Sequence, residues 1–334
     1  MNKRIFCHLL LGTALTGGLG LSASHAQDHL PIVGGKNGEW LFTPFEFASS
    51  SDAQDTQASL QLLEKTNKLF EQKGIALALV IVPSKIRIHS EQLPSSKPLD
   101  SYTADKYEKV YQSLSTSGLK VVGLNQVFLN SPHRSSDTPI FLRLDTHWSP
   151  TGALLAAETV KSVIDRTPSL KAALDTTPEQ KYTLTWGKQK VNQRARDLVK
   201  LLPPGAPSYP AEQTPQFKVL RAQESQAGLL GPADTVAITV IGSSYTNKNT
   251  GYPDGLRYTL QRDLLDISIP VDQGPWVGME AYLRDDAFKT NKPKLIIWEI
   301  PEREMRSPPS YKFREARYVI DNNEWLSRIS VLLK

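Results

Sequence analysis

The sequence predicts an α/β protein whose open, mostly parallel sheet is flanked by helices. Four segments of strand length are almost wholly apolar, at residues 75–82, 119–124, 236–241 and 295–300. Continuous apolar strands of this kind occur where a parallel sheet is covered on both faces. A helix pattern precedes the first of them, with apolar residues spaced for one helical face from Leu60 to Phe70 and an end near Gly74. Strand and helix segments that alternate in this way indicate a layered sandwich.

The remaining elements follow from local patterns. A glycine turn precedes an aromatic and apolar strand at residues 40–42. Further helices are predicted at 104–114, 150–165 and 278–288, and a further strand at 140–144. The helix at 150–165 has a favourable start, because Ser149 can cap its N-terminus and Pro150 suits the first helical position.

Residues 168–234 break this alternation. The stretch holds four closely spaced prolines, at positions 203, 204, 207 and 210, and two short strand patterns at 182–186 and 217–220. An apolar core strand follows at residue 236. The stretch is therefore predicted to be a partly β insertion within one domain that spans residues 27–334.

The N-terminus has the features of a secretory signal peptide, predicted to span residues 1–26. Lys3 and Arg4 precede an apolar segment at 5–21, and a small-residue cleavage site ends at Ala26. An uncleaved membrane anchor is the alternative, because the apolar segment is near the short limit for crossing a bilayer. Either outcome places the rest of the chain outside the cytoplasm, and no later segment is long and apolar enough to span a membrane.

Composition excludes several classes of function. Cys7, the single cysteine, lies in the predicted signal peptide, so the exported chain has neither a disulfide nor a thiolate metal site. The formal net charge is +5, and loss of Lys3 and Arg4 lowers the excess by two. So mild an excess is compatible with an acidic polymer as partner, but it is not the pattern of a nucleic-acid-binding protein.

Three residues could together form an activated serine nucleophile. Asp145 and His147 are two positions apart, a spacing that places both on one face of an extended chain, and Ser244 follows a predicted strand. A serine hydroxyl needs a base to take its proton and a carboxylate to orient that base. Both pieces follow predicted strands, where ligands of open α/β sheets bind.

The serine turn leaves some choice of roles. Ser244 is favoured as the nucleophile, with Ser243 donating hydrogen bonds in the turn. Backbone N–H groups around Ser244 are candidates for an oxyanion hole. Ser243, Tyr245 and Arg143 are further candidates for binding the oxyanion or the substrate.

Each piece also has a simpler interpretation. Asp145 could cap a loop on which His147 is a surface histidine, or Asp145 and His147 could ligate a metal ion. After residue 26 the histidines are at positions 29, 89, 133 and 147, with no His-x-x-x-His pair, so neither a metal site nor a cofactor is predicted. Lys85, which follows the first core strand, could be no more than a solvated charge.

Taken together, the motifs resemble the periplasmic alginate O-acetyltransferases, a circularly permuted group of SGNH hydrolase-like proteins. The segment 145–153, Asp-Thr-His-Trp-Ser-Pro-Thr-Gly-Ala, resembles the Asp-x-His-Trp signature of that family. Weaker similarities occur in the same order at residues 35–42, 82–85, 242–245 and 297–303. Two positions depart from the family pattern: Ser243 stands where threonine is usual, and Glu39 is an extra residue in the opening motif.

The resemblance implies a function. It assigns Ser244 as nucleophile, His147 as base and Asp145 as the group that orients the base, in an SGNH hydrolase-like three-layer sandwich. It implies an O-acetyltransferase that modifies an alginate- or cellulose-type exopolysaccharide in the periplasm through an acetyl-serine. It also implies a membrane-bound O-acyltransferase as acetyl donor and exopolysaccharide assembly proteins as partners. No carbohydrate-binding module is expected after the catalytic domain.

Two alternatives share the same sequence features. With water as acceptor, the same three residues would make a polysaccharide acetylesterase. A protein without activity could instead hold polymer or assembly partners, through aromatic side chains of the insertion such as Tyr182, Trp186 and Tyr209.

Overall fold

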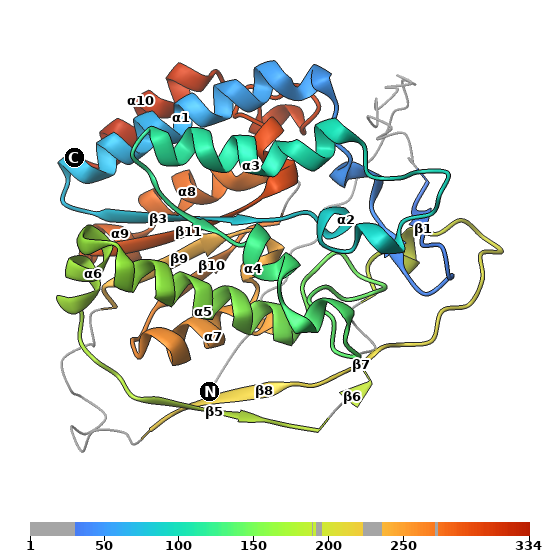
Figure 1. The fold of residues 1–334 in the computed structure, drawn as a ribbon. Helices are drawn as coiled ribbons and strands as arrows, with labels where there is room; N and C mark the ends of the chain where they lie inside the picture. The colour runs from blue at the N-terminus through green and yellow to red at the C-terminus, as the bar shows by residue number, and fades with distance from the viewer. Residues whose placement is uncertain (1–30, 189, 192–195, 223–235, 271–272) are drawn as a thin grey trace, which may run out of the picture. The chain divides into compact units, whose positions relative to one another are not determined.

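The computed structural model of the chain describes residues 31–188, 190–191, 196–222, 236–270 and 273–334, and the predicted signal peptide at 1–26 lies outside these ranges (Figure 1). Residues 32–334 group into one compact unit. Among the described helices, none combines the length and the apolar character that crossing a membrane requires.

A central sheet of five parallel strands runs in the order β10-β9-β11-β3-β4 (Figure 1). The strands are β3 Ala76–Val82, β4 Lys120–Gly123, β9 Ile238–Gly242, β10 Leu265–Ser268 and β11 Leu295–Pro301. The central strand β11 is buried along its whole length and pairs with β3 on one side and β9 on the other. Its neighbours β3 and β9 therefore end close to it, at the same edge of the sheet.

Helices cover both faces of the sheet (Figure 1). One layer contains α1 Ala53–Gln72, α3 Ser101–Thr116, α8 Gly274–Arg284, α9 Asp286–Thr290 and α10 Asn322–Leu332, and the other contains α4 Asn125–Leu129, α5 Pro150–Arg166, α6 Pro168–Asp175 and α7 Tyr252–Leu260. Alternate side chains of β3 point to opposite faces of the sheet. Leu77 and Leu79 therefore pack in one apolar core, and Ala78 and Val80 pack in the other. The predicted open α/β sheet with helices on both faces is confirmed.

The predicted strand at 140–144 is wrong. Phe141 and Trp148 form only an isolated antiparallel bridge, and the chain folds back between them. The Leu142 N–H donates to the His147 carbonyl at 3.1 Å, and the Ser149 N–H donates to the Ile140 carbonyl at 2.8 Å. An apolar segment can be buried in a folded-back loop as well as in a strand, because burial needs only packing partners.

The stretch 168–234 also differs from the prediction. Its first part is α6, whose Leu170 and Leu174 lie in the apolar core beneath the sheet, so the irregular region begins after Asp175 rather than at residue 168. The predicted short strands are present as β5 Tyr182–Trp186 and β8 Phe217–Arg221, which pair antiparallel and contact α7.

Other elements are short or were not predicted. The short ones are β1 Val33–Gly34, β2 Leu41–Phe42, α2 Lys85–Ile88, β6 Lys190–Val191 and β7 Gln213–Thr214. The predicted helix at 278–288 is two helices, α8 and α9, because Asp285 caps a new helix by accepting from the Ala287 N–H. The sequence analysis did not identify α7, β10 or α10.

Candidate active site

A tight turn at the end of β9 positions the candidate nucleophile. Gly242 ends the strand, and a three-residue 3₁₀ helix at Ser244–Thr246 follows. A Cβ atom on Gly242 would overlap both the Thr246 hydroxyl and the Glu299 carboxylate. Only glycine therefore lets the turn approach β11 this closely.

Ser243 belongs to the framework of this turn. Its N–H donates to Glu299 Oε2 at 2.7 Å, and its hydroxyl donates to the same carboxylate at 3.0 Å. The Ser243 Oγ also accepts from the Tyr245 N–H at 3.2 Å, and Thr246 Oγ1 donates to Glu299 Oε2 at 3.1 Å. Glu299 is completely buried, and burial raises the pKa of its carboxyl to about 7.

Ser244 points toward His147. The Ser244 Oγ lies 2.7 Å from His147 Nε2, and His147 Nδ1 lies 2.6 Å from Asp145 Oδ1. The Asp145 oxygen also accepts the His147 backbone N–H at 3.0 Å, so the folded-back loop, and not an extended strand, brings the pair together. A proton on Nδ1, shared with the carboxylate, leaves Nε2 free to accept the serine proton. The three predicted residues thus form one continuous hydrogen-bonded chain.

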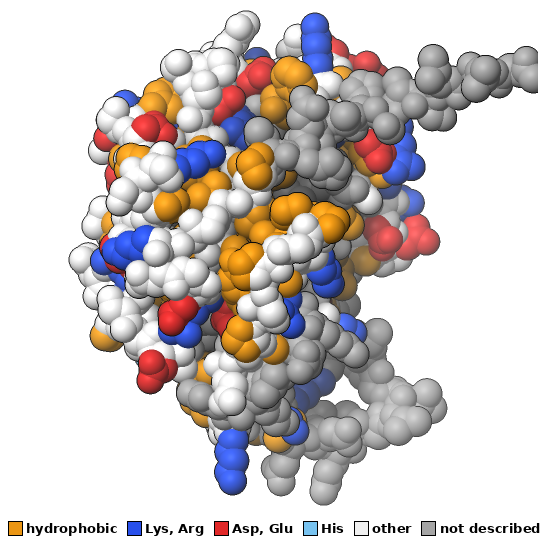
Figure 2. Space-filling view, turned by 90° about the vertical axis from the view of Figure 1, so that its right-hand side faces the viewer, with side chains coloured by type: hydrophobic (Ala, Val, Ile, Leu, Met, Phe, Trp, Pro, Cys, Tyr) orange, Lys and Arg blue, Asp and Glu red, His pale blue; other side chains and the backbone are white. Residues whose placement is uncertain are grey.

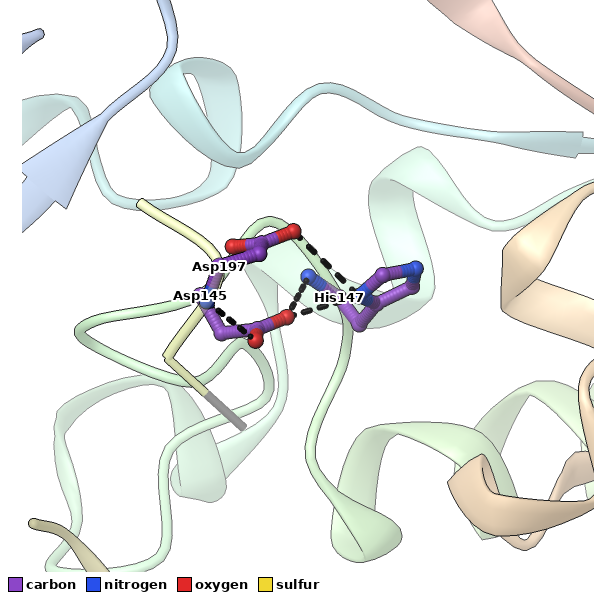
Figure 3. A group of neighbouring side chains, drawn as sticks. All are labelled: Asp145, His147 and Asp197. Carbon is purple, nitrogen blue, oxygen red and sulfur yellow. Dashed lines mark hydrogen bonds and ion pairs between the residues drawn. The ribbon is translucent and has the colours of Figure 1, made fainter. Parts of the chain in front are cut away.

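Asp197 is a fourth member of this group that the sequence analysis did not identify. Figure 3 shows one edge of the imidazole facing the Asp145 and Asp197 carboxylates, with its other edge pointing away from them. The Asp197 N–H donates to Asp145 Oδ2 at 3.0 Å, and Asp197 accepts from both the N–H, at 2.8 Å, and the hydroxyl of Thr146. Asp197 Oδ2 lies 3.7 Å from His147 Nδ1. Its local sequence carries no recognisable signal, because the contact spans 52 residues.

The two carboxylates differ in their electrostatic surroundings. Burial raises the pKa of the Asp145 carboxyl, but the hydrogen bond and charge of His147 outweigh burial and hold that pKa below its usual value. Burial and the neighbouring Asp145 charge together raise the pKa of Asp197. The charged form is therefore favoured more strongly at Asp145, beside the imidazole, than at Asp197.

The same group has the composition of a metal site. One ligand atom from each of Asp145, His147 and Asp197 lies within 4.8 Å of the others. Every carboxylate oxygen, however, already accepts a hydrogen bond from a protein N–H or O–H group. A cation at this position would have to displace these bonds, so the arrangement suits the orientation of an imidazole better than the ligation of a metal.

Tyr245 connects the nucleophile turn to the Asp–His loop. Its hydroxyl donates to the Thr146 carbonyl at 2.6 Å, and its ring centroid lies 5.1 Å from those of His147 and Trp148. Because the ring is buried and the hydroxyl hydrogen is donated to the loop, Tyr245 supports the position of the loop, and its predicted role in binding the oxyanion or the substrate stays a prediction. The Ser244 N–H has no acceptor within the described part of the chain and remains available for that task.

Arg143 lies beside the site. Its guanidinium carbon is 5.9 Å from the centroid of the Trp40 ring, and in the described residues no hydrogen bond links the side chain to Ser244 or His147. Its backbone carbonyl accepts from the buried ammonium of Lys85 at 2.8 Å. The predicted role of Arg143 in binding the oxyanion or substrate therefore stays a prediction.

Lys85 is a structural residue, not a solvated charge. Its ammonium is buried and donates to the carbonyls of Leu41 at 2.7 Å, Arg143 at 2.8 Å and Asp145 at 3.0 Å. Burial lowers the pKa of this ammonium to about 8. One side chain thus ties β2 and the Asp–His loop to the end of β3.

Comparison with known proteins identifies the family. The family model described as "SGNH hydrolase-like domain, acetyltransferase AlgX" matches residues 32–302. The chain belongs to this family. The predicted resemblance to SGNH hydrolase-like acetyltransferases is therefore confirmed.

Individual relatives of this chain have names consistent with an acetyltransferase family. The probable alginate O-acetylase AlgJ of Pseudomonas syringae pv. tomato is 30% identical over 280 residues, which cover 81% of this chain and 68% of that protein. The protein of the same name from Pseudomonas aeruginosa is 28% identical over 308 residues, covering 88% of this chain and 75% of that protein. The solved O-acetyltransferase domain of Pseudomonas putida AlgJ has the same fold, with a TM-score of 0.72 at 24% identity over 90% of this chain and 99% of that one.

Proposed function

We propose that this protein is an O-acetyltransferase that transfers acetyl groups to the hydroxyls of a bacterial exopolysaccharide through an acetyl-serine. The observation that carries the proposal is the unbroken chain of hydrogen bonds from Ser244 through His147 to Asp145. Membership of an acetyltransferase family and similarity to proteins named as probable alginate O-acetylases support it.

The first half of the reaction loads the enzyme. His147 Nε2 takes the hydroxyl proton of Ser244 as Oγ forms a bond to the carbonyl carbon of an acetyl ester. The ester C–O bond then breaks, and the departing alcohol receives the proton from His147. Asp145 holds the imidazole in the required tautomer and stabilises its charged form.

The second half transfers the acetyl group. A sugar hydroxyl gives its proton to His147 and attacks the acetyl carbon, and the bond to Ser244 Oγ breaks as the serine regains a proton. Both halves pass through a tetrahedral oxyanion. The Ser244 N–H at the start of the 3₁₀ helix has no acceptor among the described residues and is suited to bind it, and one such donor contributes about 3 kcal/mol in other acyl-transfer enzymes.

The cellular setting belongs to the same proposal. The predicted signal peptide supports a periplasmic reaction, where cytoplasmic acetyl donors are absent, and the acetyl donor we propose is a membrane-bound O-acyltransferase. Exopolysaccharide assembly proteins are the expected neighbours. The names of the relatives favour an alginate-type polymer over a cellulose-type one.

The test uses a small acetyl ester as donor and an oligosaccharide as acceptor. Ser244→Ala should abolish both acetate release and acetyl transfer. Ser243→Ala is the matched control, because its hydroxyl contacts Glu299 and not His147. This control should keep ester turnover within about tenfold of wild type, since it removes two hydrogen bonds of the turn, one donated to Glu299 and one accepted from the Tyr245 N–H, but leaves the contact between Ser244 and His147 in place. Unchanged transfer by Ser244→Ala would overturn the assignment.

The acceptor is decided in the same experiment. Acetylated oligosaccharide in the wild-type reaction supports a transferase, whereas free acetate as the sole product would assign an acetylesterase. A serine-directed covalent probe that fails to label Ser244 would indicate a protein without activity.

A further inference from the structure

Lys85 makes three hydrogen bonds that only a charged amine can make together. Its Nζ donates to the carbonyls of Leu41 at 2.7 Å, Arg143 at 2.8 Å and Asp145 at 3.0 Å. An ammonium group has three N–H donors, whereas a neutral amine has two and a lone pair that repels a carbonyl oxygen. Loss of the Lys85 proton therefore leaves one of the three carbonyls without its donor.

The ammonium of Lys85 lies beneath the surface. Figure 2 looks onto the side of the molecule where β3 ends, and hydrophobic side chains gather near the middle of this face. Lys85 begins α2 shortly after β3, yet it is only 1% exposed. The ring centroids of Trp40 and Phe42 lie 5.3 and 5.2 Å from Nζ. These rings attract a cation and shield it from solvent, so water is poorly placed to replace a lost donor.

The bonds of Lys85 hold the loop that carries the catalytic pair. Arg143 and Asp145 both lie on this loop, and the Asp145 carboxylate holds His147 Nδ1 at 2.6 Å. The third carbonyl belongs to Leu41 of β2, whose N–H also donates to the Arg143 carbonyl at 2.9 Å. One ammonium thus joins β2 to the loop directly at Asp145. A displacement of about 1 Å in a catalytic group can lower a reaction rate about a hundredfold.

Burial and neighbouring charges act on the Lys85 proton in opposite directions. The groups around it that carry or can carry charge are four carboxyls, an imidazole and a guanidinium, namely Glu46, Asp145, Asp197, Glu212, His89 and Arg143. Negative carboxylates favour the ammonium, the guanidinium opposes it, and burial lowers the pKa of the imidazole, which favours its neutral form. Burial of Lys85 outweighs the carboxylates and lowers its pKa to about 8. The proton that the loop requires is therefore held only weakly.

We propose that Lys85 is a positioning residue for the acyl transfer: its ammonium holds the Asp–His loop within reach of Ser244, and the neutral amine does not. A catalytic histidine alone gives a rate that rises as the imidazole loses its proton and then stays level with pH. Lys85 adds a fall in kcat at higher pH. This inference rests on the serine chemistry proposed above and names the group that limits it in alkaline solution.

The pH profile of ester turnover tests this role. The kcat for a small acetyl ester is measured from about pH 6 to about pH 10, with Ser244→Ala as the blank for uncatalysed hydrolysis. The wild-type kcat should begin to fall near pH 8 and be about tenfold lower one pH unit above the midpoint. Its KM should stay constant, because Lys85 touches no substrate. Circular dichroism should show a folded chain throughout, since loss of a buried charge does not itself destabilise the fold.

Two substitutions separate the ammonium from other groups. Lys85→Met should lower kcat at neutral pH at least about tenfold, with little change in KM, and should remove the fall at high pH. Lys85→Arg keeps its charge throughout this pH range and should extend its activity to higher pH than wild type. Lys36→Met is the matched control, because Lys36 is exposed, and it should reproduce the wild-type profile.

The outcomes are distinct. A wild-type kcat that stays level up to about pH 10, or a fall with the same midpoint in folded Lys85→Met, would overturn the role of Lys85. If neither variant folds, the wild-type profile and its circular dichroism still decide. Turnover that is equal in wild type and Ser244→Ala at every pH would instead overturn the proposed function, and this inference with it.

Discussion

Glu299 should make the stability of this protein fall as the pH rises toward neutrality. Its carboxyl is completely buried beneath the nucleophile turn, and burial raises its pKa from 4.5 to about 7. Between these two values the unfolded chain has lost the proton that the folded chain keeps. The free energy of unfolding therefore falls across this window and levels off above it. A difference of about 2.5 pKa units corresponds to about 3 kcal/mol.

Glu299→Gln tests this directly. The amide oxygen can accept the Ser243 N–H and the Thr246 hydroxyl, as Glu299 Oε2 does. The amide nitrogen is a donor like the protonated oxygen of a neutral carboxyl, and in both cases the Ser243 hydroxyl would accept where it donates to the charged carboxylate. The variant has no charge to lose. Urea unfolding of both proteins at half-unit steps from pH 4.5 to 8 should give a wild-type curve that falls relative to the variant by about 3 kcal/mol.

A constant difference between the two curves would refute the reasoning, because it would mean that Glu299 ionises alike in the folded and unfolded states. Glu299→Ala separates charge from hydrogen bonding. It leaves the Ser243 N–H and the Thr246 hydroxyl buried without an acceptor, at a cost of about 1–3 kcal/mol each. Ester turnover should therefore survive in the Gln variant and fall in the Ala variant.

Three further substitutions test other contacts of the site. Asp197→Asn should lower kcat for ester turnover up to about tenfold without raising KM, because the imidazolium loses a nearby negative charge; an unchanged kcat would remove Asp197 from the catalytic group. Lys85→Met should lower the free energy of unfolding in urea by about 3 kcal/mol through loss of three buried charged hydrogen bonds, whereas the exposed control Lys36→Met should leave it unchanged. Gly242→Ala should destabilise by about 1–3 kcal/mol through overlap with its neighbours, and Gly34→Ala, which has open space, should not; equal effects would contradict the packing argument.

The sheet could be predicted from sequence because burial on both faces leaves a continuous apolar signal. Residues 75–82 and 295–300 have that signal and are β3 and β11. Residues 140–144 have it too, yet they lie in a folded-back loop whose backbone bonds to itself. A short apolar segment reports that side chains are buried, but it does not report which backbone partners satisfy its N–H and C=O groups.

The contact between Asp145 and His147 in the proposed active site was predictable for a different reason. Asp145 and His147 are close in sequence, so their pairing needs little knowledge of the fold. Asp197 was not predictable, because the irregular chain that carries it has no periodic pattern. The choice between Ser243 and Ser244 likewise depends on Glu299, which takes the Ser243 hydroxyl from a strand 56 residues away. Long-range polar contacts of this kind cannot be recognised in the local sequence.

The order of the catalytic residues along the chain has no bearing on the geometry of the site. The Asp–His loop is not part of the sheet, and no strand pairing joins it to the turn after β9. What aligns the two segments is Tyr245, whose hydroxyl bonds to the loop backbone at Thr146 while its ring packs against His147. Because Tyr245 is adjacent to Ser244, this bond and this ring contact hold the His147 imidazole close to the Ser244 hydroxyl. The buried Tyr245 beside Ser244 thus fixes the position of the loop, as strand pairing fixes the positions of residues within a sheet.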